Sequence, residues 1–436
     1  MKYLFVACLL CLSVLSAVAK VPAMNKIRLT NNWEYLKGDL GGIWEAVRPA
    51  APGSSEAVPI WQPVTLPHCF NAEDAVDPDV NYYEGPGWYK TLLAIDNPYR
   101  NGRIVLDFDG AGQKTDVYVY TTHVGSHVGG YDSWNVDITD AVKAFLGSKD
   151  AKRFKGKVPL SIRCDNSRDL EMIPSDLADF NIYGGLYRYL NLVYLPEVSF
   201  EQIRLESSLS SNLKEGILKV KTSFYNPEDI RKADVTVSVY DADRKPVFSK
   251  TLEGILPLGD QLLAEMKIKN PVLWDVDVPQ LYTCELTVKT PDQTFTTEER
   301  FGFRHTEFKD KGPFFLNGKR LLLRGTHRHE DHAGVAQAMT EDMMRREMRM
   351  MKDMGVNFIR LGHYQQSEII LDLCDELGIL VWEEIPWCRG GLGGDVYKKQ
   401  ARRMLANMIV QHHNHPAVII LSLIHISEPT RRSYIS

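Results

Sequence analysis

Short apolar runs alternate with clusters of glycine, proline, asparagine and aspartate through the first two thirds of the chain. Runs of this length between turn-forming residues are typical of β-strands that pack on a common core. They fall into two series, and the second begins after Pro196. We therefore predict a β-sandwich over residues 20–197 and an immunoglobulin-like sandwich over residues 198–303.

The pattern changes after Arg304, where apolar strands alternate with amphipathic helices. Nearly continuous apolar stretches predict strands at residues 320–325, 357–361, 379–385 and 417–420. Helical spacing predicts helices at residues 340–354, 367–377 and 396–413. Strands and helices that alternate in this way form parallel βαβ units, so we predict part of a (β/α)8 barrel over residues 304–420.

The N-terminus carries a pattern of its own. Lys2 precedes an almost wholly apolar stretch over residues 4–18, and Ala17-Val18-Ala19 is a small-x-small cleavage pattern. This arrangement is typical of a secretory signal peptide, and the apolar run is shorter than the roughly 18–20 residues of a membrane span. We expect residues 1–19 to be removed after Ala19 and the product to be secreted or periplasmic.

Composition narrows the function classes further. The chain has 436 residues, of which 44% are hydrophobic and 25% charged, and its net charge is −5. This balance gives no general attraction to nucleic acid, and no second stretch is suited to cross a membrane. Cys8 and Cys11 lie in the signal peptide, and the five remaining cysteines show no CxxC spacing. We expect neither a disulfide framework nor a zinc knuckle.

Polar and aromatic residues crowd the C-terminal ends of three successive predicted barrel strands. These residues are His327–His332, then Arg360, His363 and Tyr364, then Glu383, Glu384 and Trp387. Active sites of (β/α)8 barrels lie at this end of the strands. Packing does not require such a concentration of polar groups, so the sequence predicts an active site here.

Three functions fit these residues. His327 and His329 could ligate a metal ion, as in a metal-dependent amidohydrolase. A sugar site would instead bind hydroxyl groups through histidine and arginine, and would stack a tryptophan on the pyranose ring. A non-catalytic carbohydrate-binding protein would use Trp61, Trp88 and Trp134 as a stacking platform, although core packing is the simpler interpretation of these side chains.

One stretch of the predicted barrel reads Asn357-Phe-Ile-Arg-Leu-Gly-His-Tyr and is followed by Asp375, Gly378 and Ile379-Leu-Val-Trp. Supporting segments in order are Trp61-Gln-Pro-Val, Gly85-Pro-Gly-Trp-Tyr, Tyr183-Gly-Gly-Leu-Tyr-Arg and Phe301-Gly-Phe-Arg. Together they resemble glycoside hydrolase family 2, which includes β-galactosidases and β-glucuronidases. The resemblance implies a jelly-roll sugar-binding domain, an immunoglobulin-like sandwich and a TIM barrel. The sequence departs from the family pattern at Leu361-Gly362 and at Gln365.

The resemblance also implies roles for single residues. His363 would bind the substrate and stabilise the transition state, Arg360 would orient the nucleophile, and His329 would contact a sugar hydroxyl. Asp179 lies in a segment similar to a jelly-roll loop that reaches the substrate, and a simple turn residue is an equal alternative. In the sugar-site interpretation of the strand-end residues, Trp387 would be the tryptophan that stacks on the pyranose ring. The implied activity is retaining hydrolysis of a terminal β-linked sugar of an oligosaccharide or polysaccharide, with galactose as first choice and a uronic acid as second.

The two catalytic carboxylates of such an enzyme are expected to be missing from this chain. Retaining glycosidases use two carboxyl groups about 5–5.5 Å apart, and the family supplies them after barrel strand four and from strand seven. Residues 421–436 lack the expected Asn-Glu pair and resemble a translated sequencing adapter. We therefore expect the 436-residue chain to lack glycosidase activity and to aggregate through its C-terminal third, where only half of the barrel is present. No cofactor is expected, because the segment after strand three lacks the acidic-His spacing that binds magnesium in some galactosidases.

Overall fold

The computed structural model describes residues 26–49, 59–175, 178–227, 230, 232–387 and 393–422. The expected signal peptide and residues 423–436 of the expected adapter-derived tail lie outside this part of the chain. Among the described helices, none is both long and apolar enough to cross a membrane. Cys69, Cys164, Cys284 and Cys374 are buried and free, and Cys388 lies outside the described residues.

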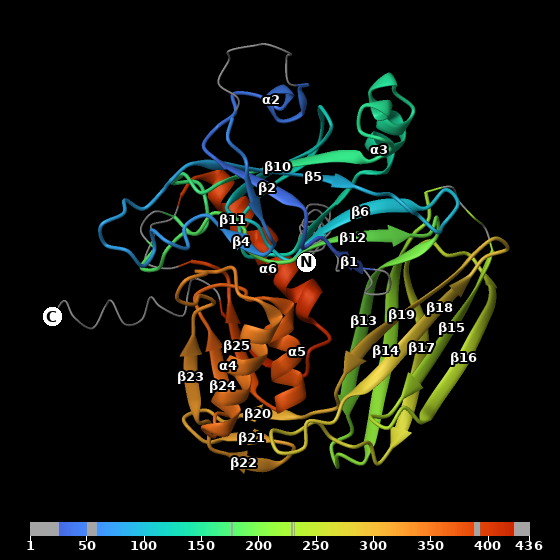
Figure 1. The fold of residues 1–436 in the computed structure, drawn as a ribbon. Helices are drawn as coiled ribbons and strands as arrows, with labels where there is room; N and C mark the ends of the chain where they lie inside the picture. The colour runs from blue at the N-terminus through green and yellow to red at the C-terminus, as the bar shows by residue number, and fades with distance from the viewer. Residues whose placement is uncertain are drawn as a thin grey trace, which may run out of the picture.

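The N-terminal domain is a sandwich of two antiparallel sheets (Figure 1). One sheet has the order β1 (Lys26–Arg28), β12 (Leu190–Leu195), β6 (Arg103–Phe108) and β9 (Trp134–Asp137). The other has the order β3 (Gln62–Val64), β2 (Trp33–Lys37), β5 (Pro86–Leu93), β10 (Val158–Asp165), β7 (Lys114–Val119) and β8 (Thr122–Val128). A short pair joins β4 (His68–Cys69) to β11 (Gly185–Leu186), and the helical segments are α2 (Trp44–Val47), α3 (Thr139–Leu146) and η1 (Lys149–Lys152).

The tryptophans of this domain do not form a stacking platform. Trp88 and Trp134 are almost fully buried, and Trp134 stacks on Phe108 with ring centroids 4.1 Å apart. Trp61 lies under the Lys90 ammonium, 4.1 Å from the ring centroid. Core packing is therefore confirmed for Trp88 and Trp134, because a buried indole offers no face to a sugar.

Partly buried His68 makes this domain sensitive to acid. Burial lowers the pKa of His68 to about 4, and its Nδ1 lies 2.9 Å from the Tyr89 hydroxyl. The unfolded chain takes up a proton at the ordinary pKa near 6.5, whereas the folded chain does so only near 4. The free energy of unfolding therefore falls by about 3 kcal/mol as the pH drops through this window. We expect the His68→Gln variant to lose less thermal stability than the wild type between pH 6.5 and 4, which calorimetry measures. Equal losses would contradict this assignment.

The second domain is a sandwich of antiparallel sheets, as predicted. Its smaller sheet has the order β13 (Ser199–Leu209), β14 (Glu215–Tyr225) and β17 (Gly259–Lys269). The larger has the order β16 (Pro246–Ile255), β15 (Ala233–Tyr240), β18 (Tyr282–Lys289) and β19 (Thr294–Phe301). Buried and partly exposed positions alternate strictly along β14 and β18, so each strand turns one face to a shared apolar core.

The C-terminal part alternates strands with helices, and its strands form one parallel sheet. The sheet has the order β23 (Gly325–Arg328), β24 (Phe358–Leu361), β25 (Leu380–Glu384) and β26 (Val418–Ser422). The helices are α4 (Glu341–Asp353), α5 (Glu368–Leu377) and α6 (Asp395–His412). The predicted βαβ units are therefore confirmed, and residues 421 and 422 of the expected tail continue β26.

Local signals set the helix ends. The Thr340 hydroxyl accepts a hydrogen bond from the backbone N–H of Met343, and the Ser367 hydroxyl accepts one from Ile369. Gly378 ends α5 in the left-handed conformation, at φ +67°. A side chain at this position would also collide with the backbone of Val276. Both the left-handed conformation and the lack of space therefore require glycine here.

The prediction of a first barrel strand at residues 320–325 is wrong. A small antiparallel sheet precedes the barrel and consists of β20 (Thr306–Phe308), β21 (Phe314–Leu316) and β22 (Lys319–Leu321). Leu322 follows it with 70% of its surface exposed, so the apolar run is not a buried strand. The Asn357 side chain holds the turn, because it donates to the Leu322 carbonyl and accepts from the Arg324 N–H. The barrel strand starts only at Gly325, which places His327 on the strand itself.

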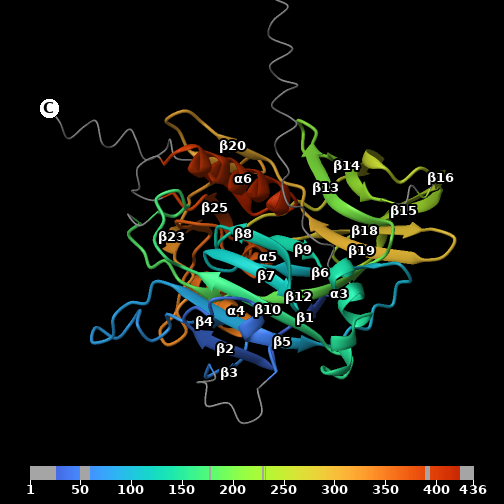
Figure 2. The same ribbon diagram turned by 90° about the horizontal axis from the view of Figure 1, so that it is seen from above.

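The barrel segment lies beneath the jelly-roll-like domain and beside the second sandwich (Figures 1 and 2). Helix α6 packs against the first domain, where Asn407 Nδ2 donates to Asp132 Oδ2 at 2.6 Å and Gln411 Nε2 donates to the Ser133 carbonyl at 2.9 Å. Helix α5 faces the second sandwich, where Arg300 pairs with Asp372 and Glu376. Both sandwiches therefore position the barrel strands.

Candidate active site

Strand register brings the candidate residues to one face of the parallel sheet. His327 lies opposite Arg360, and Arg360 lies opposite Trp382. Successive side chains of a strand alternate between faces, so His329 and Glu384, each two residues further along, share the face of His327 and Trp382. The sheet thus gathers these side chains at the C-terminal end of the strands, where the sequence predicts an active site.

A carboxylate between an arginine and a histidine forms the centre of this face. Arg360 Nη2 donates to Glu384 Oε1 at 2.7 Å and Arg360 Nε donates to Oε2 at 3.2 Å, while His363 Nδ1 lies 2.8 Å from Oε1. Because a carboxylate only accepts, we assign the hydrogen of His363 to Nδ1. The Nε2 lone pair of His363 is then available to a ligand.

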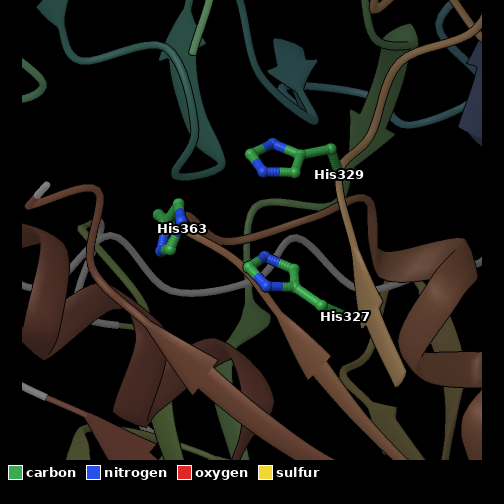
Figure 3. Close-up of side chains that lie close together, drawn as sticks. All are labelled: His327, His329 and His363. Carbon is green, nitrogen blue, oxygen red and sulfur yellow. The ribbon is translucent and has the colours of Figure 1, made fainter. Parts of the chain in front are cut away.

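The histidine cluster, which we define as His327, His329 and His363, surrounds a common space (Figure 3). His327 and His329 extend from β23 and the segment after it, and their rings are nearly parallel with centroids 5.1 Å apart. The His363 ring stands across both, at 4.9 Å from His327 and 5.5 Å from His329. Three imidazoles from two strands therefore meet at one point.

Two of these histidines favour the uncharged state. Partial burial, together with the neighbouring Arg360 guanidinium, lowers the pKa of His327. Partial burial lowers the pKa of His329 as well, and the Asp331 carboxylate opposes that shift. Neutral imidazoles present one N–H donor and one lone pair each, which suits them to sugar hydroxyl groups or to a metal ion.

A loop of the first domain completes the site with an aromatic side chain. Phe180 stacks on His363 at an interplanar angle of 23° and contacts His329 and Tyr364, with ring centroids 5.1–6.1 Å apart. The Tyr364 hydroxyl accepts from the Glu330 backbone N–H and lies 3.4 Å from His329 Nδ1. Sequence reasoning missed Phe180, although it follows Asp179, which marked this loop as one that reaches the site.

The other two candidates sit at the margin. The Asp179 carboxylate acts electrostatically on His329 and raises its pKa against the effect of burial. Trp387 is half-buried and packs against an apolar cluster formed by Ile173, Ile385 and residues of α6, next to residues 388–392 that the structure does not describe. The structure thus brings Arg360, His363, His329 and Asp179 together, while Trp387 lies against α6.

A buried ion pair that was not predicted holds the first domain to the barrel. Arg188 donates to Glu330 through Nε at 3.2 Å and through Nη2 at 3.1 Å, and both side chains are essentially inaccessible. Glu330 Oε2 also accepts from the backbone N–H of Ser367, which caps α5. In the sequence, Arg188 stands out only as the last residue of the segment Tyr183-Gly-Gly-Leu-Tyr-Arg. No local pattern in the sequence identifies Glu330 as its partner.

Family models match almost the whole described chain. The sugar-binding domain of glycosyl hydrolases family 2 matches residues 40–196, a second model described as glycosyl hydrolases family 2 matches residues 198–304, and the family 2 TIM barrel domain matches residues 307–436. The chain belongs to glycosyl hydrolase family 2. The chain has the expected multidomain fold of jelly roll, immunoglobulin-like sandwich and TIM-barrel segment, and this family differs from the metal-dependent amidohydrolases that His327 and His329 also suggest.

Individual relatives agree with the family. A β-glucuronidase of Bacteroides fragilis is 32% identical over 83% of this chain and 52% of its own length, and a β-galactosidase of Thermoanaerobacterium thermosulfurigenes is 30% identical over 90% and 53%. The crystal structure of Parabacteroides merdae β-glucuronidase with glycerol in the active site is 98% identical, with a TM-score of 0.91 over 93% of this chain and 52% of that one. Bacteroides uniformis β-glucuronidase 3 is 58% identical, with a TM-score of 0.88 over 92% and 51%. The chain spans about half the length of these relatives.

Proposed function

We propose that the enzyme that carries this chain hydrolyses terminal β-glucuronides with retention of configuration. The observation behind the proposal is the 98% identity to a structure named as a β-glucuronidase, supported by the 58% identity to a second one. A β-galactosidase among the relatives is only 30% identical. A uronic acid, the second choice from the sequence, therefore replaces galactose as the proposed sugar.

In this proposal the described residues bind and orient the sugar. His363, fixed by Glu384, offers Nε2 to the substrate and to the transition state, and His329 contacts a hydroxyl group. Arg360 keeps its predicted role toward the nucleophile, and Asp179 contributes a hydroxyl contact from the jelly-roll loop. Stacking by Trp387 stays a prediction. We assign neither the acid/base nor the nucleophile to a described residue.

A panel of nitrophenyl glycosides tests the proposed sugar. We expect kcat/KM for the β-glucuronide to exceed that for the β-galactoside by at least roughly 100-fold. A site built to bind the carboxylate of a uronic acid leaves its own polar groups without partners when a sugar that lacks this carboxylate binds. Faster turnover of the β-galactoside would overturn the assignment. NMR of the first released sugar should show the β-anomer, and an α-anomer would contradict retention.

Localisation and the behaviour of the isolated chain complete the proposal. Export after cleavage behind Ala19 is part of the proposal and rests on the apolar N-terminal pattern. The inactivity and aggregation expected for the 436-residue chain by itself, and the adapter origin expected for residues 421–436, also stay predictions. The proposed substrate is an oligosaccharide, a polysaccharide or another β-glucuronide, and no nucleic acid is expected.

A further inference from the structure

The histidine cluster has the composition of a metal site as well as of a sugar site. Each of its three rings offers a nitrogen, and these nitrogens all lie within 4.8 Å of one another. Zinc binds imidazole nitrogen at about 2.0–2.1 Å, so two nitrogens on one tetrahedral ion lie about 3.4 Å apart. Small side-chain rotations would close the difference, because His327 is exposed and the other two rings are only half-buried.

The partners of His363 match those of a metal-bound histidine. Its Nδ1 lies 2.8 Å from Glu384 Oε1, so the carboxylate fixes the ring and leaves Nε2 free for a ligand. Ligating histidines almost always make such a hydrogen bond, which orients the ring and increases its basicity. Arg360 acts on the cluster as a cation, and its paired contact with Glu384 offsets part of that charge.

Neighbouring residues limit the positions of His327 and His329 without fixing them. A side chain at residue 362 would approach His327 Nε2 to 2.4 Å, so the ring occupies space that only Gly362 leaves open. The Tyr364 hydroxyl, 3.4 Å from His329 Nδ1, is placed to accept the hydrogen of that nitrogen and so to turn Nε2 toward the cluster. The Asp331 carboxylate acts on His329 and adds negative potential that favours a cation.

We propose that the histidine cluster binds one divalent late transition metal ion of the zinc class, and that the bound ion inhibits the enzyme by occupying His329 and His363. Imidazole ligands select such ions over magnesium and calcium, which prefer oxygen. The inhibition rests on the proposed function, because His329 and His363 are its sugar contacts. Metal binding itself does not rest on it.

Titration calorimetry with Zn²⁺, and the visible absorption of Co²⁺ as a spectroscopic probe, test the binding on metal-free enzyme without an affinity tag. We expect one ion per chain, and we expect His327→Gln to weaken its binding at least about tenfold. His332→Gln is the matched control, because exposed His332 follows the same strand but points its Nδ1 to the Ala333 carbonyl. An absent ion, or equal affinities for the wild type and His327→Gln, would overturn the proposal.

Inhibition is measured separately with Zn²⁺ and is scaled to the activity of each variant without zinc. The half-inhibiting Zn²⁺ concentration should rise with glycoside concentration and should rise at least about tenfold in His327→Gln, in step with the binding constant. Inhibition that does not depend on glycoside concentration would contradict the proposal that the ion inhibits by occupying the sugar contacts His329 and His363. Zinc binding in an enzyme that fails to cleave β-glucuronides would support the metal site and contradict the proposed function.

Discussion

The Arg188→Met variant is expected to lose more stability than any surface substitution in this chain. Arg188 and Glu330 are both fully buried, and methionine would leave the Glu330 carboxylate in the interior without its cation. Breaking a buried pair in this way costs about 3–5 kcal/mol. The guanidinium also donates to the carbonyls of Tyr131, at 2.9 Å, and Gln365, at 2.6 Å, and these acceptors would lose their partner.

Thermal unfolding of the enzyme that carries this chain measures the effect. A loss of this size lowers the apparent Tm by roughly 6–20 °C in a domain of 150–250 residues. Arg244→Met is the matched control, because Arg244 forms the same kind of paired contact with Glu298 at the surface and should leave the Tm unchanged. An unchanged Tm in Arg188→Met would contradict the structural role.

A double variant separates the missing charge from the missing contacts. Arg188→Met with Glu330→Gln removes both charges at once, so no ion stays buried alone. We expect the double variant to be no less stable than Arg188→Met, although two contacts are removed instead of one. Additive losses would show that the pair stabilises the junction through packing and not through charge.

Elements with local signals could be predicted from the sequence. The helices predicted at residues 340–354 and 367–377 begin at Thr340 and Ser367, and Gly378 follows the second, each through contacts within a few residues. The exception is the first barrel strand, where three consecutive leucines imitate a buried strand. Leu322 is nevertheless exposed, because the Asn357 side chain turns the backbone there from the next strand. Apolar character alone does not distinguish these outcomes.

The site was predictable in its position but not in its connections. The rule that barrel chemistry lies at strand ends located His327, His329, Arg360 and His363. Phe180, however, reaches these residues from the first domain. The hydrophobic and polar pattern around Phe180, or around His363, does not indicate that the two side chains touch. Distant contacts of this kind depend on how whole domains pack.

Neighbouring glutamates illustrate the same limit more sharply. Glu383 and Glu384 both lie near the end of a predicted strand, and the sequence does not distinguish their roles. Alternation sends them to opposite faces: Glu384 contacts Arg360 and His363 in the site, whereas Glu383 lies 2.8 Å from His412 Nδ1 of α6. The strand therefore supplies a test residue and its own control side by side.

Glu384→Gln is expected to reduce catalysis without unfolding the enzyme. Glutamine keeps the shape of the side chain but removes the charge, and its NH₂ group would face either Arg360 or the N–H of His363, donor against donor. Hydrogen bonds to charged groups contribute up to about 3 kcal/mol, so we expect kcat/KM for the β-glucuronide to fall roughly 30- to 150-fold. The loss should appear mainly in kcat, since His363 is proposed to act on the transition state.

Glu383→Gln is the control for this variant. It breaks the contact with His412 outside the site, so it should lower the Tm while kcat/KM stays within about threefold of the wild type. Glu384→Asp keeps the charge at a shorter reach and should recover part of the lost kcat. Equal kcat/KM values for Glu384→Gln and Glu383→Gln would contradict the role of Glu384, because a purely structural carboxylate on either face of β25 would then suffice. If kcat/KM falls in Glu384→Gln but not in Glu383→Gln, and Glu384→Asp recovers part of it, catalysis depends on the Glu384 charge that positions Arg360 and His363.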